Sequence, residues 1–404
     1  MPVLHAFSDA TGLQINYHKS TFAPIHVELN IAQAMALDLG CPVASFPQTY
    51  LGLPLSTHKL KLSAFRPYLE KLRNRLPGWV GKATPISGRA ILVKASLRSM
   101  ASHLLSAIIV PAGTILALDK ICRAFFWAGD DHVTGGQCKV AWDELCAPVS
   151  KGGLGFRCLR THNQALLMKF LSKLHSDSSL PWAQWLRRRY ASLELSDLQA
   201  LVASVNLNDS VPDVRVARSD GRPLTTKTAY LAAFDHLQEV PFATTTWKNF
   251  ATNRCRIFLW LADRDRLFTN ERRFRRGIAS SDSYPFCSST ESSVHLLLHC
   301  PSVLPFWIAV PALHDDVMSC FSLRDLWDGS SACQVRTSVI ICALWNIWKR
   351  RNTKVFRNEV EPIHLVFRRC ADNISLWSHR TKNPSHKSLA EDWAVRFYHL
   401  ARNE

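Results

Sequence analysis

The sequence lacks the features that direct a protein into or across a membrane. Residues 1–30 contain no charged start followed by an apolar core and a small-residue cleavage site, so we expect no signal peptide. The longest apolar run, Leu104–Leu118, is interrupted by Pro111 and Gly113 and is too short to span a bilayer. The 12 cysteines are scattered singly, unlike the dense framework of a secreted disulfide scaffold. These absences predict a nuclear or cytoplasmic protein with no membrane partner.

Acidic residues are scarce relative to basic ones. The 404 residues include 49 Lys and Arg against 32 Asp and Glu, which gives a formal net charge of +17. Such an excess favours a polyanionic partner, so we expect RNA or DNA and no small-molecule substrate. An alternative interpretation is a solvated cationic face without a ligand. With 47% hydrophobic and 20% charged residues, the chain is long and apolar enough for two or three folded domains.

Groupings of residues typical of enzymes are missing as well. Nucleotidyl transfer needs paired carboxylates that hold two metal ions, and the adjacent Asp130 and Asp131 lie in a GDDH segment that we interpret as a solvated turn. The GGLG segment, residues 152–155, lacks the Gly-Lys-Ser/Thr ending of a phosphate-binding loop and predicts a tight turn. None of the 16 histidines is paired with a nucleophile in a recognisable motif. The sequence therefore predicts a protein that is not an enzyme.

Basic residues gather in two stretches with helical periodicity. Phe65, Leu69, Leu72 and Leu76 recur at helical spacing, and residues 61–100 carry nine Lys or Arg against one acidic residue. A second amphipathic helix is predicted at Arg254–Leu267, before another arginine cluster. Because cations on helices neutralise phosphates, we predict nucleic-acid contacts by twelve of these residues. They are Lys71, Arg73, Arg75, Arg89, Lys94, Arg98, Arg254, Arg256, Arg272, Arg273, Arg275 and Arg276.

A candidate metal site lies in the segment YPFCSSTESSVHLLLHCP. Cys287, His295 and Cys300 follow the spacing C-x7-H-x4-C, and thiolate and imidazole are the ligands that tetrahedral zinc prefers. The fourth ligand of a C-x2-C pair would stand at Tyr284, whose phenol is a poor ligand because it must lose its proton, and His299 is the nearby substitute. We predict zinc as the cofactor; the alternative is a loop whose thiols pack as small apolar groups.

These segments together resemble the reverse transcriptases of plant non-LTR (LINE-type) retrotransposons. GLQINYHKS and YLGLPL are similar to the end of the polymerase palm, and LPGWVGKATPISGRAILVKASL, FFWAG and VAWDELCAPVSKGGLGFRCL are similar to the thumb region. The segment WKNFATNRCRIFLWLADRDRLFTNERRFRRGI and the Cys287–Cys300 segment resemble the reverse-transcriptase zinc-binding domain. Tyr284 departs from that family, which has a cysteine there.

The resemblance implies a mainly α fold with a short α/β palm remnant at the N-terminus. Its expected parts are a palm remnant at 1–60, a thumb-like helical region at 61–175, a linker at 176–224, a zinc-binding domain at 225–312 and a helical tail at 313–404. The family's catalytic aspartates are not present, so we expect a truncated, catalytically inactive derivative that retains nucleic-acid binding. The alternatives are a subunit that supports a reverse transcriptase completed in trans, and a relic without a biochemical role.

Overall fold

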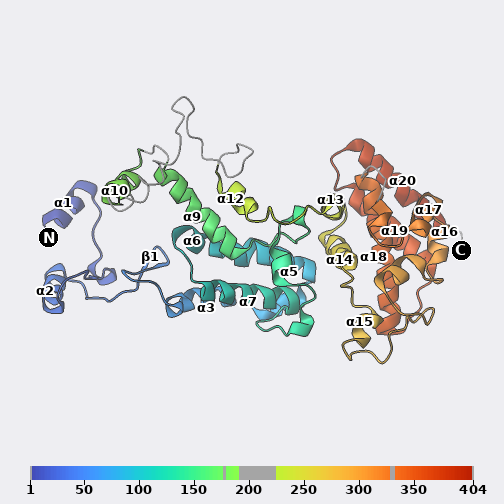
Figure 1. Ribbon diagram of the computed structural model, residues 1–404, viewed down its shortest axis with the longest axis horizontal. Coiled ribbons are helices and arrows are strands. Elements are labelled where there is room, and N and C mark those ends of the chain that lie inside the picture. Colours follow the sequence, from blue (N-terminus) through green and yellow to red (C-terminus); the bar gives the residue numbers. More distant parts are fainter. Residues whose placement is uncertain (1, 176–178, 191–223, 328–332, 403–404) are drawn as a thin grey trace, which may run out of the picture.

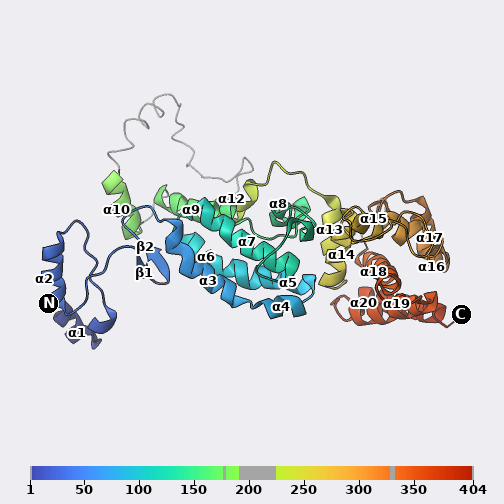
Figure 2. The same ribbon diagram turned by 90° about the horizontal axis from the view of Figure 1, so that it is seen from below.

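A computed structural model describes residues 2–175, 179–190, 224–327 and 333–402 of the chain. The described residues form many helices and only two short strands, which confirms the prediction of a mainly α fold (Figure 1). No helix in these ranges is both long and apolar enough to cross a membrane. Most of the predicted linker, residues 176–178 and 191–223, lies outside the described residues. In both ribbon views the N-terminus lies at one end of the long axis and the C-terminus at the other (Figures 1 and 2).

The N-terminal part contains two helices and the single hairpin of the described residues. The hairpin turns through Leu51 and Gly52, which both have positive φ, as a two-residue hairpin turn requires. The interpretation of this part as a palm remnant stays a prediction. Its elements are α1 (Pro2–Thr11), α2 (Leu29–Leu39), β1 (Gln48–Tyr50) and β2 (Leu53–Leu55).

The middle of the chain is a helical body built around α7. Helix α7 buries Leu118, Phe125 and Phe126 and ends at Gly129, whose left-handed φ of 68° suits a helix C-terminus. Between α5 and α6, residues Val93–Leu97 form a π-helical stretch. The helices of this body are α3 (Arg66–Arg75), α4 (Gly78–Ala83), α5 (Ile86–Leu92), α6 (Arg98–Ala107), α7 (Ala112–Ala128), α8 (Trp142–Cys146), α9 (Leu159–His175) and α10 (Pro181–Tyr190).

The C-terminal part is organised around α18, which is buried on nearly all sides from Val335 to Trp348. Helix α18 packs against α14, α19 and α20, and Phe306 stacks on Phe367 of α19 with ring centroids 4.6 Å apart. The helices here are α12 (Thr226–Ala232), α13 (Pro241–Trp247), α14 (Asn253–Asp263), α15 (Asn270–Phe274), α16 (Leu304–Ile308), α17 (Pro311–Ser319), α18 (Gln334–Arg357), α19 (Ile363–Ser378) and α20 (Pro384–Leu400).

The turn at residues 152–155 joins the middle and C-terminal parts. Gly152 has a φ of 86°, and its carbonyl oxygen accepts hydrogen bonds from Arg264 and from Nε1 of Trp260, the latter at 2.8 Å. Gly153 lies so close to the preceding segment that a Cβ there would stand 2.0 Å from the carbonyl oxygen of Ala147. The predicted tight turn is present.

The close approach at Gly153 makes this turn sensitive to a single methyl group. We expect Gly153→Ala to lower the free energy of unfolding by about 1–3 kcal/mol, because the backbone of the turn or of Ala147 must move. Gly135→Ala is the control, since no atom lies within 4 Å of its Cβ position. Urea denaturation measures both variants. Equal stability of Gly153→Ala and the wild type would contradict the packing described.

Candidate metal centre and cationic surfaces

A short loop and a π-helical turn bring the predicted metal ligands together. The loop closes on Tyr284, whose amide donates to the Ser289 carbonyl at 2.7 Å and whose carbonyl accepts from the Cys287 amide at 3.2 Å. The second element, His295–His299, is a π turn in which the Cys300 amide donates to the His295 carbonyl at 2.8 Å. An i→i+5 bond places the residues at its two ends on one side of the turn. The five-residue separation of His295 and Cys300 therefore suits this geometry.

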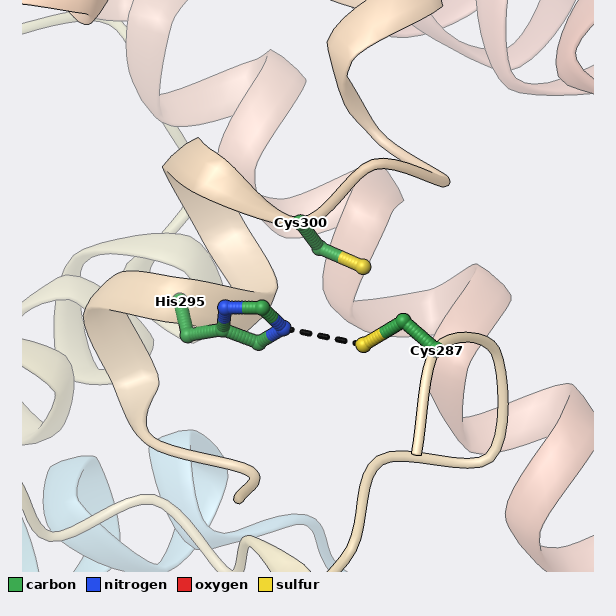
Figure 3. Close-up of side chains that lie close together, drawn as sticks. All are labelled: Cys287, His295 and Cys300. Atoms are coloured by element: carbon green, nitrogen blue, oxygen red, sulfur yellow. Dashed lines mark hydrogen bonds between the residues drawn. The ribbon is translucent and has the colours of Figure 1, made fainter. Parts of the chain in front are cut away.

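The three predicted ligand side chains point toward one another (Figure 3). The donor atoms of Cys287, His295 and Cys300 all lie within 4.8 Å of one another, and Cys287 Sγ is 3.1 Å from His295 Nε2. Desolvation lowers the pKa of His295, which favours the neutral imidazole that binds metals. Two sulfur donors and one imidazole nitrogen in this arrangement fit a soft tetrahedral metal ion.

Tyr284 stands beside this cluster, and its buried phenol is a poor fourth ligand. Its side chain is 1% exposed and its ring centroid lies 6.0 Å from that of His295. Burial first, and then the neighbouring Cys300 and Glu291, raise the pKa of the Tyr284 phenol, so the hydroxyl keeps its proton. The substitute His299 is engaged elsewhere, since its Nε2 lies 2.9 Å from the carbonyl oxygen of Cys320. Among the described residues, the protein thus offers three ligands here.

A buried ion pair holds the ligand loop against α18. Arg351 and Glu291 both have fully buried side chains, and Arg351 Nε donates to Glu291 Oε1 at 2.7 Å while its Nη2 donates to Oε2. Glu291 also accepts from the amide of Asn270 at the start of α15, and Arg351 donates to the Asn270 side chain at 3.2 Å. These hydrogen bonds tie the loop, α15 and α18 into one unit. Glu291 lies between Cys287 and His295 in the sequence.

Arg350, the residue before Arg351 on α18, makes a second connection to the ligand segment. Arg350 Nη1 donates to the carbonyl of Ser302 at 3.0 Å, and its guanidinium lies 4.6 Å from the Phe286 ring centroid. Sequence reasoning did not identify Glu291, Arg350 or Arg351 as part of this site. A single acidic residue inside an otherwise uncharged loop was the available signal, but its partner is 60 positions away.

The basic residues of the first stretch occupy different environments. Lys71, Arg73 and Arg75 are exposed on α3, opposite the buried Leu69 and Leu72. Arg89 is half-buried. Lys94 donates to the carbonyl of Leu154, and Arg98 is only 4% exposed and pairs with Asp119 at 2.9 Å. Because Arg98 is buried and paired, we leave it out of the proposed nucleic-acid surface.

The second stretch also divides into exposed and engaged cations. Arg254 is exposed, whereas Arg256 donates to the carbonyl of Asn249. On and beside α15, the arginines contact neighbouring groups. The contacts are Arg272 to the Asp265 carbonyl, Arg273 to the Asn270 side chain, Arg275 to Glu271 and Arg276 to the Gly136 carbonyl.

The structure brings members of the two stretches together around Lys139, which sequence reasoning missed. Desolvation first, and then the positive charges of Arg272, Arg276 and Arg89, lower the pKa of Lys139 to about 8. Arg89 comes from α5, whereas the other two arginines come from α15 and the turn after it. No spacing in the sequence relates Lys139 to these arginines, so only the tertiary structure reveals the cluster.

Comparison with known proteins places the ligand cluster in a family. Residues 224–307 match the family described as zinc-binding in reverse transcriptase. Over these residues the chain is similar to a reverse-transcriptase zinc-binding region. A protein of Arabidopsis thaliana named "Putative ribonuclease H protein" is 24% identical to it over 452 residues, an alignment that covers 86% of this chain and 69% of the relative. The matched zinc-binding region contains Cys287, His295, Cys300 and Glu291, whereas Arg350 and Arg351 lie beyond it. The reverse-transcriptase zinc-binding part of the resemblance is confirmed.

Replacement of Tyr284 tests the interpretation of the three-ligand cluster. We expect Tyr284→Cys to bind zinc more tightly than Tyr284→Ser by on the order of a hundredfold, because a fourth thiolate would share in the roughly 10–16 kcal/mol of a structural zinc site. The serine variant leaves a similar cavity without a good ligand. Competition with a chromophoric chelator measures both affinities. Equal zinc affinity in the two variants would show that position 284 does not face the metal.

Removal of one member of the buried ion pair should be costly. We expect Arg351→Met to lower the free energy of unfolding by about 3–5 kcal/mol, because Glu291 is left buried without its cation. Arg275→Gln, which removes a partly exposed pair with Glu271, should leave stability nearly unchanged. Thermal and urea denaturation compare the two variants. A small and equal effect would mean that Glu291 is reached by water and that the pair does not hold the loop.

Proposed function

We propose that this protein derives from a plant non-LTR (LINE-type) retrotransposon and binds RNA or DNA without catalysing a reaction itself. The observation that carries the proposal is the convergence of Cys287, His295 and Cys300 within a region that matches the reverse-transcriptase zinc-binding family. The compartment that we propose is nuclear or cytoplasmic, where a polyanionic partner of this kind is found.

Zinc is the metal that we propose for the cluster. Cys287, His295 and Cys300 would hold it, and it would fix the ligand loop to the π turn and screen the two thiolates. The thiol and imidazole donors favour zinc over the hard cations magnesium and calcium, which take oxygen ligands. We assign a structural role to the metal, because its three ligands come from two separate segments, the ligand loop and the π turn, which the metal would join.

Binding to nucleic acid is supported by cations that the protein does not use for its own fold. Lys71, Arg73 and Arg75 on α3, and Arg254 on α14, are exposed, and no ion pair joins them to an acidic group within the described ranges. Exposed Lys and Arg bind phosphate without reading the base sequence, and they release counterions when they do so. We therefore propose an affinity that is strongly salt-dependent and only weakly dependent on sequence.

We propose that the protein does not catalyse a reaction because of the way its acidic residues are distributed. The Arabidopsis relative is named a ribonuclease H protein, and two-metal phosphoryl chemistry of that kind requires gathered carboxylates. Over the part of the chain that the structure describes, the one group of three or more potential metal ligands is the Cys287–His295–Cys300 cluster, which contains no carboxylate. This distribution of acidic residues supports a binding role, and not a catalytic one, for the described part of the chain.

Salt titration of binding tests the proposed function. We expect the logarithm of the association constant for a DNA duplex to fall linearly with the logarithm of salt concentration, and the triple variant Lys71→Gln/Arg73→Gln/Arg75→Gln to reduce the slope by about 0.9 for each phosphate that is no longer neutralised. The triple variant Lys169→Gln/Lys382→Gln/Arg402→Gln removes the same charge from exposed positions away from α3. Fluorescence anisotropy measures both. A flat salt response, or equal slopes in the two variants, would refute the proposed surface.

A further inference from the structure

An open pocket lies where the segment after α7 meets α15. Its volume is about 680 Å³, within the range of about 300–1,000 Å³ typical of ligand pockets. Trp127 at the end of α7, Gln137 and Lys139 line one side, and Phe268, Arg276 and Ile278 line the other. Arg276 also donates to the carbonyl of Gly136 in the pocket wall, so the two sides are in direct contact. The pocket is separate from the metal cluster.

The charged residues that line this pocket are all basic. Lys139 and Arg276 line it, and Arg89 and Arg272 are near enough to act on Lys139 electrostatically. No acidic residue lines the pocket, and the Lys139 ammonium has no hydrogen-bond acceptor among the described residues. These four cations repel one another, and an anion placed among them would relieve that repulsion. The hydrogen-bonding capacity of Arg276 is also incompletely used, since a guanidinium carries five N–H donors.

Two aromatic side chains also line the pocket. Phe268 is half-buried with its ring 5.9 Å from Lys139 Nζ, and Trp127 contributes part of an indole to the wall. An aromatic surface beside a cation is the combination that binds a nucleobase and its phosphate together, because every base has a π face and every nucleotide an anionic group. The bases of a duplex are stacked inside it, and a duplex is too wide to enter a pocket of this size.

Two further cations lie near the pocket, on different helices. Arg89 lies on α5 and Arg272 lies on α15, and both are near enough to act on Lys139 electrostatically. A free nucleotide has phosphate on one side of its sugar only, whereas a nucleotide within a strand has phosphates on both. Cations beside the pocket can therefore meet the neighbouring phosphates of a strand, which an isolated nucleotide lacks.

We propose that this pocket binds one unpaired nucleotide of a single-stranded RNA or DNA, with the base against Phe268 and Trp127 and the phosphate beside Lys139 and Arg276. The inference rests on the proposed function, because it assigns a subsite to the same nucleic-acid partner. It adds a preference that exposed cations alone do not produce, namely discrimination of a single strand from a duplex.

Two substitutions separate the contribution of the base from that of the phosphate. The probe is a single-stranded oligo(dT) of about 12 nucleotides, and its comparison is a DNA duplex of the same length. We expect Phe268→Leu to weaken oligo(dT) binding about tenfold through loss of base stacking while the salt slope and the duplex affinity stay unchanged. We expect Lys139→Met to reduce the salt slope for oligo(dT) by about 0.7, the value for one phosphate contact of a single strand.

Phe274→Leu is the matched control for the aromatic substitution. Phe274 lies on α15 and is 50% exposed, but it does not line the pocket. Circular dichroism checks that each variant is folded. A photo-crosslink on the wild-type protein provides a measurement that needs no variant: 5-iodouracil in the oligonucleotide should attach to the peptide that contains Phe268 or to the one that contains Trp127.

The possible results distinguish failure of this inference from failure of the proposed function. If Phe268→Leu binds oligo(dT) as the wild type does, or loses duplex affinity equally, the pocket is not a nucleotide subsite, although salt-dependent binding stands. Crosslinks confined to other peptides would lead to the same conclusion. If thymidine monophosphate competes with oligo(dT) when both are at the same concentration, the pocket binds a small molecule and not a strand. That result would overturn the inference. Absence of salt-dependent binding to both probes would refute the subsite and the proposed function together.

Discussion

The buried ion pair between Arg351 and Glu291 is the constraint on which the metal centre depends. Both side chains are fully removed from water, so each charge needs the other and the hydrogen bonds from and to Asn270. The pair fixes the loop that carries Cys287 at one place on α18 and thereby sets the distance to the π turn that carries His295 and Cys300. Residues 224–307, which match the zinc-binding family, therefore depend for their packing on α18, which lies outside the matched residues.

This support explains how the ligand cluster is assembled although tyrosine stands at the fourth position. The protonated Tyr284 phenol fills space beside the cluster and packs against Phe286 at a ring distance of 5.3 Å. The loop is shaped by its own backbone hydrogen bonds and by the contacts of Arg350 and Arg351, not by four metal bonds. The scaffold that presents the three candidate ligands therefore does not depend on a fourth.

Local sequence patterns predicted much of the fold and of the metal site, whereas the long-range pairs could not be predicted. Apolar spacing located the helix that buries Leu69 and Leu72, and the C-x7-H-x4-C spacing located three side chains that do converge. The same reasoning treated all arginines as equally available. It could not foresee that Arg98 would be buried beside Asp119, because which cation faces the core depends on contacts between distant segments. The cluster around Lys139 was missed for the same reason.

Zinc titration of the metal-free protein tests the central claim that a supported loop and a π turn form a three-residue metal site. Isothermal titration calorimetry should show one zinc ion bound per chain in the wild type and loss of that binding in the double variant Cys287→Ser/Cys300→Ser, with the helical circular dichroism of the two proteins alike. Zinc binding with the same stoichiometry and affinity in the double variant, or none in the wild type, would contradict the account.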